Sequence, residues 1–371
     1  MKRKEYIDWL RNLGILLLFP FHTARIFNDN PEFYVKGVEH TPSTVFIGMT
    51  SFWFMPLLFL LAGMSSRYAL LKRPARHYLK ERHRRLLIPF VFGCLVVVPP
   101  QAYYAMKFHE GYRGGYPEFL RSYFTDFSEW TVLTGISPAH LWFILFLFVI
   151  SLALLPLMLG VLRRGQRPVR PGRPFLVLLV PAVVMALLSL LPEAGGENIF
   201  VYAGYVFLGF LLAGNDATLA AIQRARAGYL ALAVPGAVAV VVQRSLTDGP
   251  QDAVFTAWQQ PVCVAALLAL LGYGQRYLDR PSSFMRWFSP AAFPVYILHQ
   301  TFLIVIAYYA LRESDRIAVA FPVIMIGSFV LSVLSYEIIR RTWGLRTLFG
   351  LSAAAARPAR RAAEETAPAG R

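Results

Sequence analysis

Apolar residues in this chain gather into long uninterrupted runs, a pattern that differs from the alternating or 3.6-residue periods of soluble domains. A helical run of about 17–25 apolar residues spans the hydrocarbon core of a bilayer. Such runs lie near residues 13–27, 45–71, 86–106, 141–161, 175–191, 199–213, 228–242, 253–273, 291–311 and 317–339. The pattern therefore predicts an all-α polytopic membrane protein with about ten transmembrane helices.

The loops between these runs differ strongly in charge. When successive loops are assigned alternately to two sides, 29 of the 37 Lys and Arg residues fall on the side of the N-terminus. Cytoplasmic loops carry such an excess of positive charge, so both termini are predicted to be cytoplasmic. Lys2, Arg3 and Lys4 precede the first run as in a secretory signal, but no small-residue cleavage site follows. We expect an uncleaved first helix.

Composition narrows the possible classes of protein. Hydrophobic residues make up 56% of the chain, which is too many for a disordered basic tail, and two cysteines are too few for a disulfide scaffold. The net charge of +16 would suit a nucleic-acid binder, but apolar runs of membrane length would not, so no nucleic-acid partner is expected. Residues 1–345 are predicted to form one transmembrane domain, and the Ala/Pro/Arg-rich residues 346–371 a disordered cytoplasmic tail.

Ionisable residues inside a membrane span are expensive and often functional. Arg11, just before the first run, and His22 within it lie eleven positions apart, about three turns or 16 Å along a helix. They share a face, with Arg11 at the cytoplasmic entrance and His22 in the outer half. The structural alternative makes Arg11 a topological anchor and His22 a hydrogen-bonded core histidine.

A basic segment, residues 67–85, follows the second run. Anionic lipid headgroups attract such segments, which would give it a purely topological role. Arg82 and Arg85, however, are one helical turn apart at the start of the third run, where two guanidinium groups form a fork suited to phosphates. Both interpretations remain open from these residues alone.

Other polar residues mark the later runs. His299, with Tyr296 and the helix-kinking Pro294 before it, is expected near the bilayer midplane in the ninth run. Trp142 opens the fourth run, where tryptophan commonly lies at the membrane interface. The two cysteines lie within spans without metal-ligand spacing, so no metal site is expected.

Taken together, these residues resemble the bacterial integral-membrane acyltransferase 3 family over nearly the whole chain. The resemblance rests on Arg11 and His22 preceded by Asp8, on Arg82 and Arg85 before Leu86-Leu87-Ile88-Pro89, and on the Pro- and Gly-containing second run, residues 55–63. Residues 8–11, 62–66 and 99–103, the last including Gln101, resemble the branch of the glucan biosynthesis protein C type.

The resemblance implies a membrane-embedded O-acyltransferase that moves an acyl group of the acetyl or succinyl class from cytoplasmic acyl-CoA to a hydroxyl of a glycan or other envelope acceptor. Arg82 and Arg85, helped by Arg11, would bind the phosphates, and His22 would act as general base or carry the acyl group. His299 or Gln300 would partner His22. Asp8, Gln101, Trp142 and Tyr296 would line the pocket.

The resemblance also implies no tightly bound cofactor and a location in the bacterial cytoplasmic membrane. The alternative function is a transporter or exporter, because intramembrane His and Arg residues also serve proton relays. A transporter predicts inverted repeats, and we see no such symmetry between residues 1–165 and 173–340. The acyl group, the acceptor and the oligomeric state are not specified by the sequence.

Overall fold

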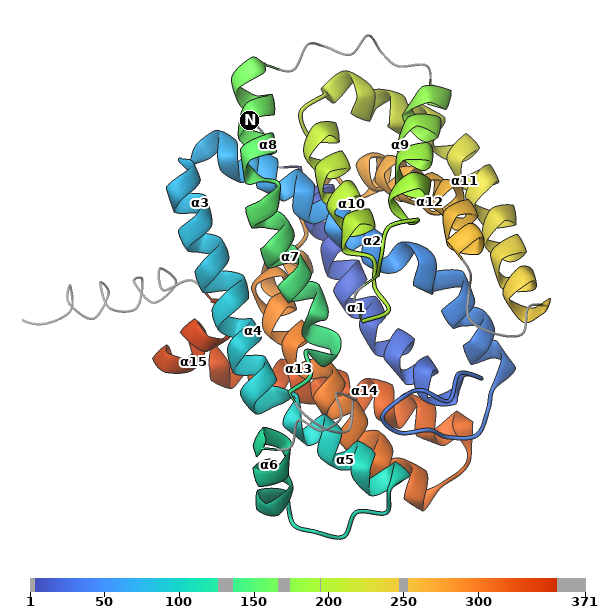
Figure 1. The fold of residues 1–371 in the computed structure, drawn as a ribbon, viewed down its shortest axis with the longest axis vertical. Helices are drawn as coiled ribbons and strands as arrows, with labels where there is room; N and C mark the ends of the chain where they lie inside the picture. Colours follow the sequence, from blue (N-terminus) through green and yellow to red (C-terminus); the bar gives the residue numbers. More distant parts are fainter. Residues whose placement is uncertain (1–3, 126–135, 166–173, 194, 247–252, 352–371) are drawn as a thin grey trace, which may run out of the picture.

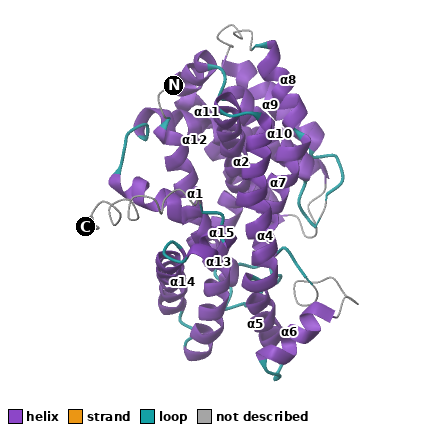
Figure 2. Cartoon of the chain, turned by 90° about the vertical axis from the view of Figure 1, so that its left-hand side faces the viewer, coloured by secondary structure: helices purple, strands orange, loops and turns teal. Residues whose placement is uncertain are grey.

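The computed structural model describes residues 4–125, 136–165, 174–193, 195–246 and 253–351, and within them the chain is almost entirely helical and contains no β-strand (Figures 1 and 2). The first half contains α1 (Glu5–Phe27), α2 (Thr41–Lys72), α3 (Ala75–Arg82), α4 (Ile88–Phe92), α5 (Pro99–His109), α6 (Tyr116–Thr125), α7 (Trp142–Ala153) and α8 (Leu155–Arg164). The second half contains α9 (Pro174–Leu188), α10 (Ile199–Leu212), α11 (Asp216–Leu246), α12 (Ala253–Tyr277), α13 (Ser283–Glu313), α14 (Ile317–Ile339) and α15 (Trp343–Leu348). The all-α class is confirmed.

Six helical segments in the described residues are long and apolar enough to cross a membrane, and a seventh forms if the bent pair 139–153 and 155–164 is one span. The six are α2, the continuous segment Ala75–His109, α11, α12, α13 and α14. The chain is therefore polytopic. The predicted number of ten also requires α1, which carries several charged residues, and the shorter apolar helices α9 and α10. That number remains a prediction.

Helix α1 lies inside the bundle, where it packs against α2, α12, α13 and α14 (Figure 1). Its buried side chains include Leu10, Leu18 and Phe19, and the small Gly14 lets Leu58 of α2 approach closely. Because four helices contact α1, much of its surface faces protein. This placement puts Arg11 and His22 where a site can form.

Helix α2 runs without interruption through Pro56. An ideal Cβ on Gly63 would lie 1.8 Å from the Val206 carbonyl oxygen of α10, and one on Gly209 would lie 1.9 Å from the Leu60 carbonyl oxygen. Glycine at both positions lets the two backbones cross in close contact, as small residues do between membrane helices. Gly63 therefore serves close packing against α10.

The predicted third run lies in the continuous helical segment Ala75–His109, which contains two π turns, η1 (His83–Leu87) and η2 (Gly93–Val97). Pro89 follows the first turn and Pro99 the second, and each lacks the amide hydrogen that an α-helix requires. Widened turns of this kind are frequent at functional sites. Here the first one begins immediately after Arg82.

The C-terminal boundary differs slightly from the expectation. Residues 346–348 belong to the short helix α15, so the tail does not begin at residue 346. Leu345 and Leu348 pack against the main core, which explains why the helix forms there. Residues 352–371 of the predicted tail lie outside the described part of the chain.

Candidate active site

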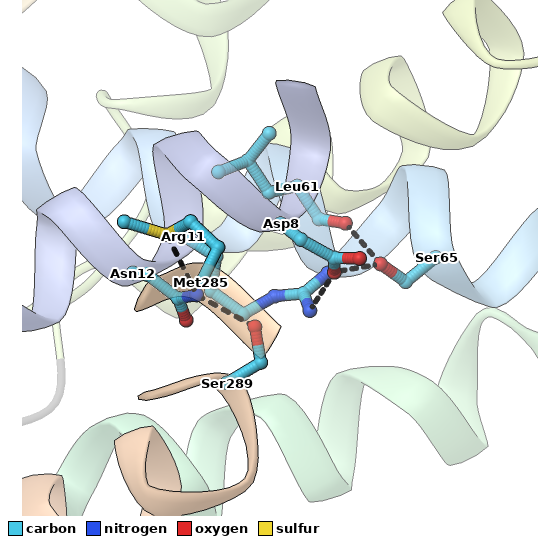
Figure 3. Close-up of polar contacts among 7 residues, drawn as sticks. All are labelled: Asp8, Arg11, Asn12, Leu61, Ser65, Met285 and Ser289. Atoms are coloured by element: carbon cyan, nitrogen blue, oxygen red, sulfur yellow. Dashed lines mark hydrogen bonds and ion pairs between the residues drawn. The ribbon is translucent and has the colours of Figure 1, made fainter. Parts of the chain in front are cut away.

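Arg11 is held in place by two partners on different helices (Figure 3). Its Nη1 donates to Asp8 Oδ1 at 2.9 Å, one turn earlier on α1, and its Nη2 donates to Ser65 Oγ of α2 at 2.7 Å. Ser65 in turn donates to the Leu61 carbonyl oxygen at 2.8 Å. The predicted pocket residue Asp8 therefore fixes the Arg11 guanidinium group, which remains 38% exposed in its side chain.

Asn12, the next residue on α1, ties this end of the site to α13. Its side-chain nitrogen donates to Ser289 Oγ at 2.7 Å and contacts Met285 Sδ at 3.3 Å (Figure 3). Asn12 is 2% exposed, so these contacts satisfy a buried amide. The first turns of α1 are thus connected by hydrogen bonds to both α2 and α13.

Arg82 binds Ser66, the neighbour of the Ser65 that binds Arg11. Its Nη2 donates to Ser66 Oγ at 2.8 Å, and its guanidinium group lies 4.8 Å from the centre of the Tyr78 ring. Ser66 also accepts a hydrogen bond from Tyr78 Oη at 3.1 Å and donates to the Ala62 carbonyl oxygen. The adjacent serines of α2 therefore bring Arg11 and Arg82 to the same level of the bundle.

Arg85 makes a different contact. Its Nε pairs with Glu81 Oε1 at 3.3 Å, and Glu81 also pairs with Arg73. The π turn that begins at His83 changes the angular spacing between Arg82 and Arg85 from that of an α-helix. The described contacts therefore do not join the two guanidinium groups, and the predicted fork remains a prediction.

Three histidines from three elements meet farther along α1. The ring centres of His22 and His299 of α13 are 5.1 Å apart, and those of His299 and His140 are also 5.1 Å apart. His22 Nδ1 and His299 Nε2 are buried and have no hydrogen-bond partner in the described part of the chain. In those same residues, no group of three or more His, Cys, Asp or Glu side chains is arranged to hold a metal ion.

His140, in the 3₁₀ turn η3 (Ala139–Leu141), has both ring nitrogens engaged. Its Nε2 donates to the Ile297 carbonyl oxygen at 2.9 Å, and Gln101 Nε2 donates to its Nδ1 at 3.4 Å. Gln101 also donates to Thr301 Oγ1, and its own oxygen accepts from Gln300 Nε2 at 3.0 Å. Gln101 therefore organises the histidine cluster, and the Gln300 amide nitrogen is used within this network.

The last two predicted pocket residues lie at different distances from His22. Tyr296 Oη donates to the His140 carbonyl oxygen, and its ring centre is 5.8 Å from that of His299. Trp142 packs against Phe59, Phe146 and Tyr202. Tyr296 thus belongs to the histidine cluster, whereas the described ring contacts of Trp142 are with a separate aromatic group.

The loop after α1 covers His22. Lys36 Nζ donates to the backbone oxygens of Arg25, Asn28 and Asn30, and the Phe33 ring stacks on His22 with centres 6.2 Å apart. Burial, and then repulsion from Arg25, lowers the pKa of Lys36 to about 8. The Asp29 and Glu39 carboxylates partly oppose this shift, and the backbone hydrogen bonds of Lys36 hold the loop in this position.

Several members of the site were not predicted as site residues from the sequence. Ser65, Ser66, Tyr78 and His140 acquire their importance from partners that are distant along the chain. The available signal was weak, since serines are common at membrane helix interfaces. His140, at the start of an apolar run, gave a stronger signal, because ionisable residues are rare there.

A comparison with protein families settles the class of the chain. A family model described as an acyltransferase domain, that of acyltransferase 3, matches residues 4–337. The chain belongs to the acyltransferase 3 family. It is therefore a multi-pass membrane O-acyltransferase.

The chain is also similar to two curated proteins. Both are named Glucans biosynthesis protein C, one from Escherichia coli O157:H7 strain EC4115 and one from Escherichia coli O157:H7. Each is 22% identical over 281 residues, which cover 74% of this chain and 67% of the relative. No solved structure matches the chain.

Proposed function

We propose that this acyltransferase transfers an acyl group of the acetyl or succinyl class from cytoplasmic acyl-CoA to a hydroxyl group on the outer side of the bacterial cytoplasmic membrane. One observation carries the proposal: α1 presents an arginine near one end and a histidine near the other, and each is joined there by further polar groups from other helices. Acyl-CoA, which has its phosphates at one end and its reactive thioester at the other, fits such an arrangement.

At the arginine end, Arg11 and Arg82 supply charge for the phosphates of coenzyme A. Guanidinium groups are well suited to phosphate because their donors are arranged in a planar fork. Ser65 and Ser66 hold both groups at one level before the donor binds. Arg85, paired with Glu81, would join them only by exchanging its carboxylate partner for a phosphate.

At the histidine end, the thioester of the donor would meet the acceptor hydroxyl. The separation of Arg11 and His22, about 16 Å along the helix axis, matches delivery by an extended pantetheine arm. His22 takes the hydroxyl proton as the oxygen attacks the thioester carbon, and the carbon–sulfur bond then breaks. The departing thiolate is protonated and leaves as free coenzyme A.

The acceptor is proposed to be a glycan, because the curated relatives carry the name Glucans biosynthesis protein C. The proposed outer acceptor side agrees with the charge distribution, in which the arginine end of α1 belongs to the Lys- and Arg-rich side. His22, eleven residues later, then lies toward the opposite surface.

The test is a transfer assay with the purified full chain in lipid nanodiscs. Radiolabelled acetyl-CoA and succinyl-CoA are supplied separately with a linear or cyclic glucan, and release of free thiol is measured together with label on the glucan. We expect thiol release and acylation that both disappear in His22→Ala. A His22→Ala protein with full activity, or a wild-type protein that uses neither donor, would contradict the proposal.

A further inference from the structure

His299 has a defined proton position. Its Nδ1 lies 2.5 Å from the Tyr296 carbonyl oxygen. A carbonyl oxygen only accepts hydrogen bonds, so Nδ1 carries the proton and Nε2 is the unprotonated acceptor of the neutral ring. That Nε2 atom is buried and has no partner in the described residues. A buried acceptor without a donor requires an explanation.

The complementary atom lies on the neighbouring ring. His22 Nδ1 is also buried and without a partner in the described part, and the two ring centres are 5.1 Å apart with planes tilted by 39°. If His22 carries its proton on Nδ1, that atom is a donor and His299 Nε2 is the acceptor that it lacks. The two rings are thus neighbours with complementary unpaired atoms.

We propose that His299 is a positioning residue that holds His22 with its proton on Nδ1, so that His22 Nε2 is the atom free to take the acceptor's proton. The inference rests on the proposed function of His22 as the base. When His22 Nε2 takes the hydroxyl proton, the resulting imidazolium retains its Nδ1 proton and donates it in a charge-assisted hydrogen bond to His299 Nε2.

The surroundings of His22 support this assignment. Within the described residues, the titratable and charged groups that face it are His299 of α13, His140 of η3 and Arg25 of its own helix, and none of these is a carboxylate. His140 uses Nε2 for the Ile297 carbonyl oxygen and Nδ1 for Gln101, so both of its nitrogens are occupied. His299 therefore supplies the free acceptor within the cluster.

The amide nitrogen of the alternative partner, Gln300, is hydrogen-bonded to Gln101. Gln300 Nε2 donates to Gln101 Oε1, and that contact helps to fix the amide that faces His140. Gln300 thus orients the far side of the cluster. The choice between two adjacent residues of α13 follows from which of them leaves an acceptor atom unpaired.

Two substitutions at His299 separate a positioning role from a packing role. His299→Gln keeps an amide oxygen close to the position of Nε2, whereas His299→Asn can replace only the Nδ1 position. We expect His299→Asn to lower kcat by about 10²-fold, within the range of general-base effects. His299→Gln should recover most of the activity, and the KM for acyl-CoA should stay within about twofold of the wild-type value in both.

The same assay distinguishes the outcomes. If both variants lose activity equally, or if both lose the thermal shift that acyl-CoA gives the wild-type protein, His299 has only a structural role and the inference is overturned. A His299→Asn protein with wild-type kcat also overturns it. If wild-type protein uses no acyl-CoA, or if His22→Ala is fully active, the proposed function itself fails first.

Discussion

Ser65 and Ser66 show how single hydroxyl groups organise two cations. Ser66 uses all of its hydrogen-bonding capacity, because it donates to the Ala62 carbonyl oxygen and accepts from Tyr78 and Arg82. Ser65 makes the equivalent link for Arg11. The serine hydroxyls are uncharged, so they position both guanidinium groups without neutralising them, whereas Arg11 is also paired with Asp8.

Arg82→Gln tests the role of the Arg82 guanidinium group in donor binding. The loss of a charged donor to phosphate should raise the KM for acyl-CoA about 10-fold or more, since hydrogen bonds to charged groups contribute about 1.5–3 kcal/mol. The value of kcat at saturating donor should change little. Steady-state kinetics at varied acyl-CoA concentration provide the measurement.

Arg76→Gln is the matched control for that substitution. Arg76 lies on the same helix, α3, and is exposed. The Arg76→Gln substitution also removes one positive charge from the basic segment, so a purely topological or lipid-binding effect would appear in both variants. An equal rise in KM for the two would show that Arg82 has no specific role in donor binding.

At the scale of elements, the crossing of α2 and α10 depends on glycine. Gly63→Ala would place a methyl carbon 1.8 Å from the Val206 carbonyl oxygen, so the two helices would have to separate. We expect a marked loss of stability, of at least the 1–3 kcal/mol typical of overpacked cores. The measurement is the thermal unfolding midpoint in detergent.

Gly228→Ala provides the comparison. Gly228 lies within α11, and an added Cβ would meet no atom within 4 Å. Because alanine favours helix over glycine by about 1 kcal/mol, this substitution should leave the midpoint unchanged or raise it. A similar loss in both variants would show that the α2–α10 crossing is not the cause.

The loop before α10 should make stability depend on pH. Glu197 accepts a hydrogen bond from Tyr202, and Asn198 caps the helix by accepting from the amides of Phe200 and Val201. Burial raises the pKa of Glu197 to about 7, the Tyr202 hydrogen bond opposes this, and Glu193 adds to it. The folded state therefore favours the protonated carboxyl group.

The raised pKa of Glu197 determines the direction in which stability changes with pH. The pKa of Glu197 is higher in the folded state than its ordinary value of 4.5, so this contribution is fully present below pH 4.5 and is lost as pH rises through about 7. We expect the unfolding midpoint to fall between pH 5 and 8, and Glu197→Gln to reduce that fall. An exposed control, Glu313→Gln, should keep the wild-type slope.

At the scale of the whole molecule, charge asymmetry predicts the orientation of the chain in the membrane. Its Lys and Arg residues are concentrated in one set of loops, and the arginine end of α1 belongs to that side. The proposed reaction requires this polarity, because the donor would come from the cytoplasm and the acceptor from the opposite side. Orientation and mechanism are therefore linked through α1.

Labelling of single cysteines tests the orientation. Glu110, after α5, and Arg164, at the end of α8, are both exposed, and the predicted topology places them on opposite sides. In spheroplasts, Glu110→Cys should react with a membrane-impermeant maleimide. Arg164→Cys should react only after permeabilisation. The reverse pattern would invert the proposed direction of transfer.

Much of the architecture was predictable because a bilayer permits few alternatives. Backbone polar groups in lipid must be satisfied internally, so long apolar runs become helices whatever their neighbours are. The residues that such a run should exclude, Arg11, His22 and His299, were conspicuous for the same reason. The ion pairs of Glu337 with Arg340 and Arg341 were likewise local enough to expect.

The sequence by itself determined the all-α membrane class and the polar residues that merit attention, since both follow from local composition. Only the tertiary structure decided which of those residues meet. It placed Arg82 on Ser66 and Arg85 on Glu81, and it left the free acceptor on His299 while using Gln300 for Gln101. Contacts between helices far apart in the chain depend on how their surfaces pack, and no local pattern specifies that packing.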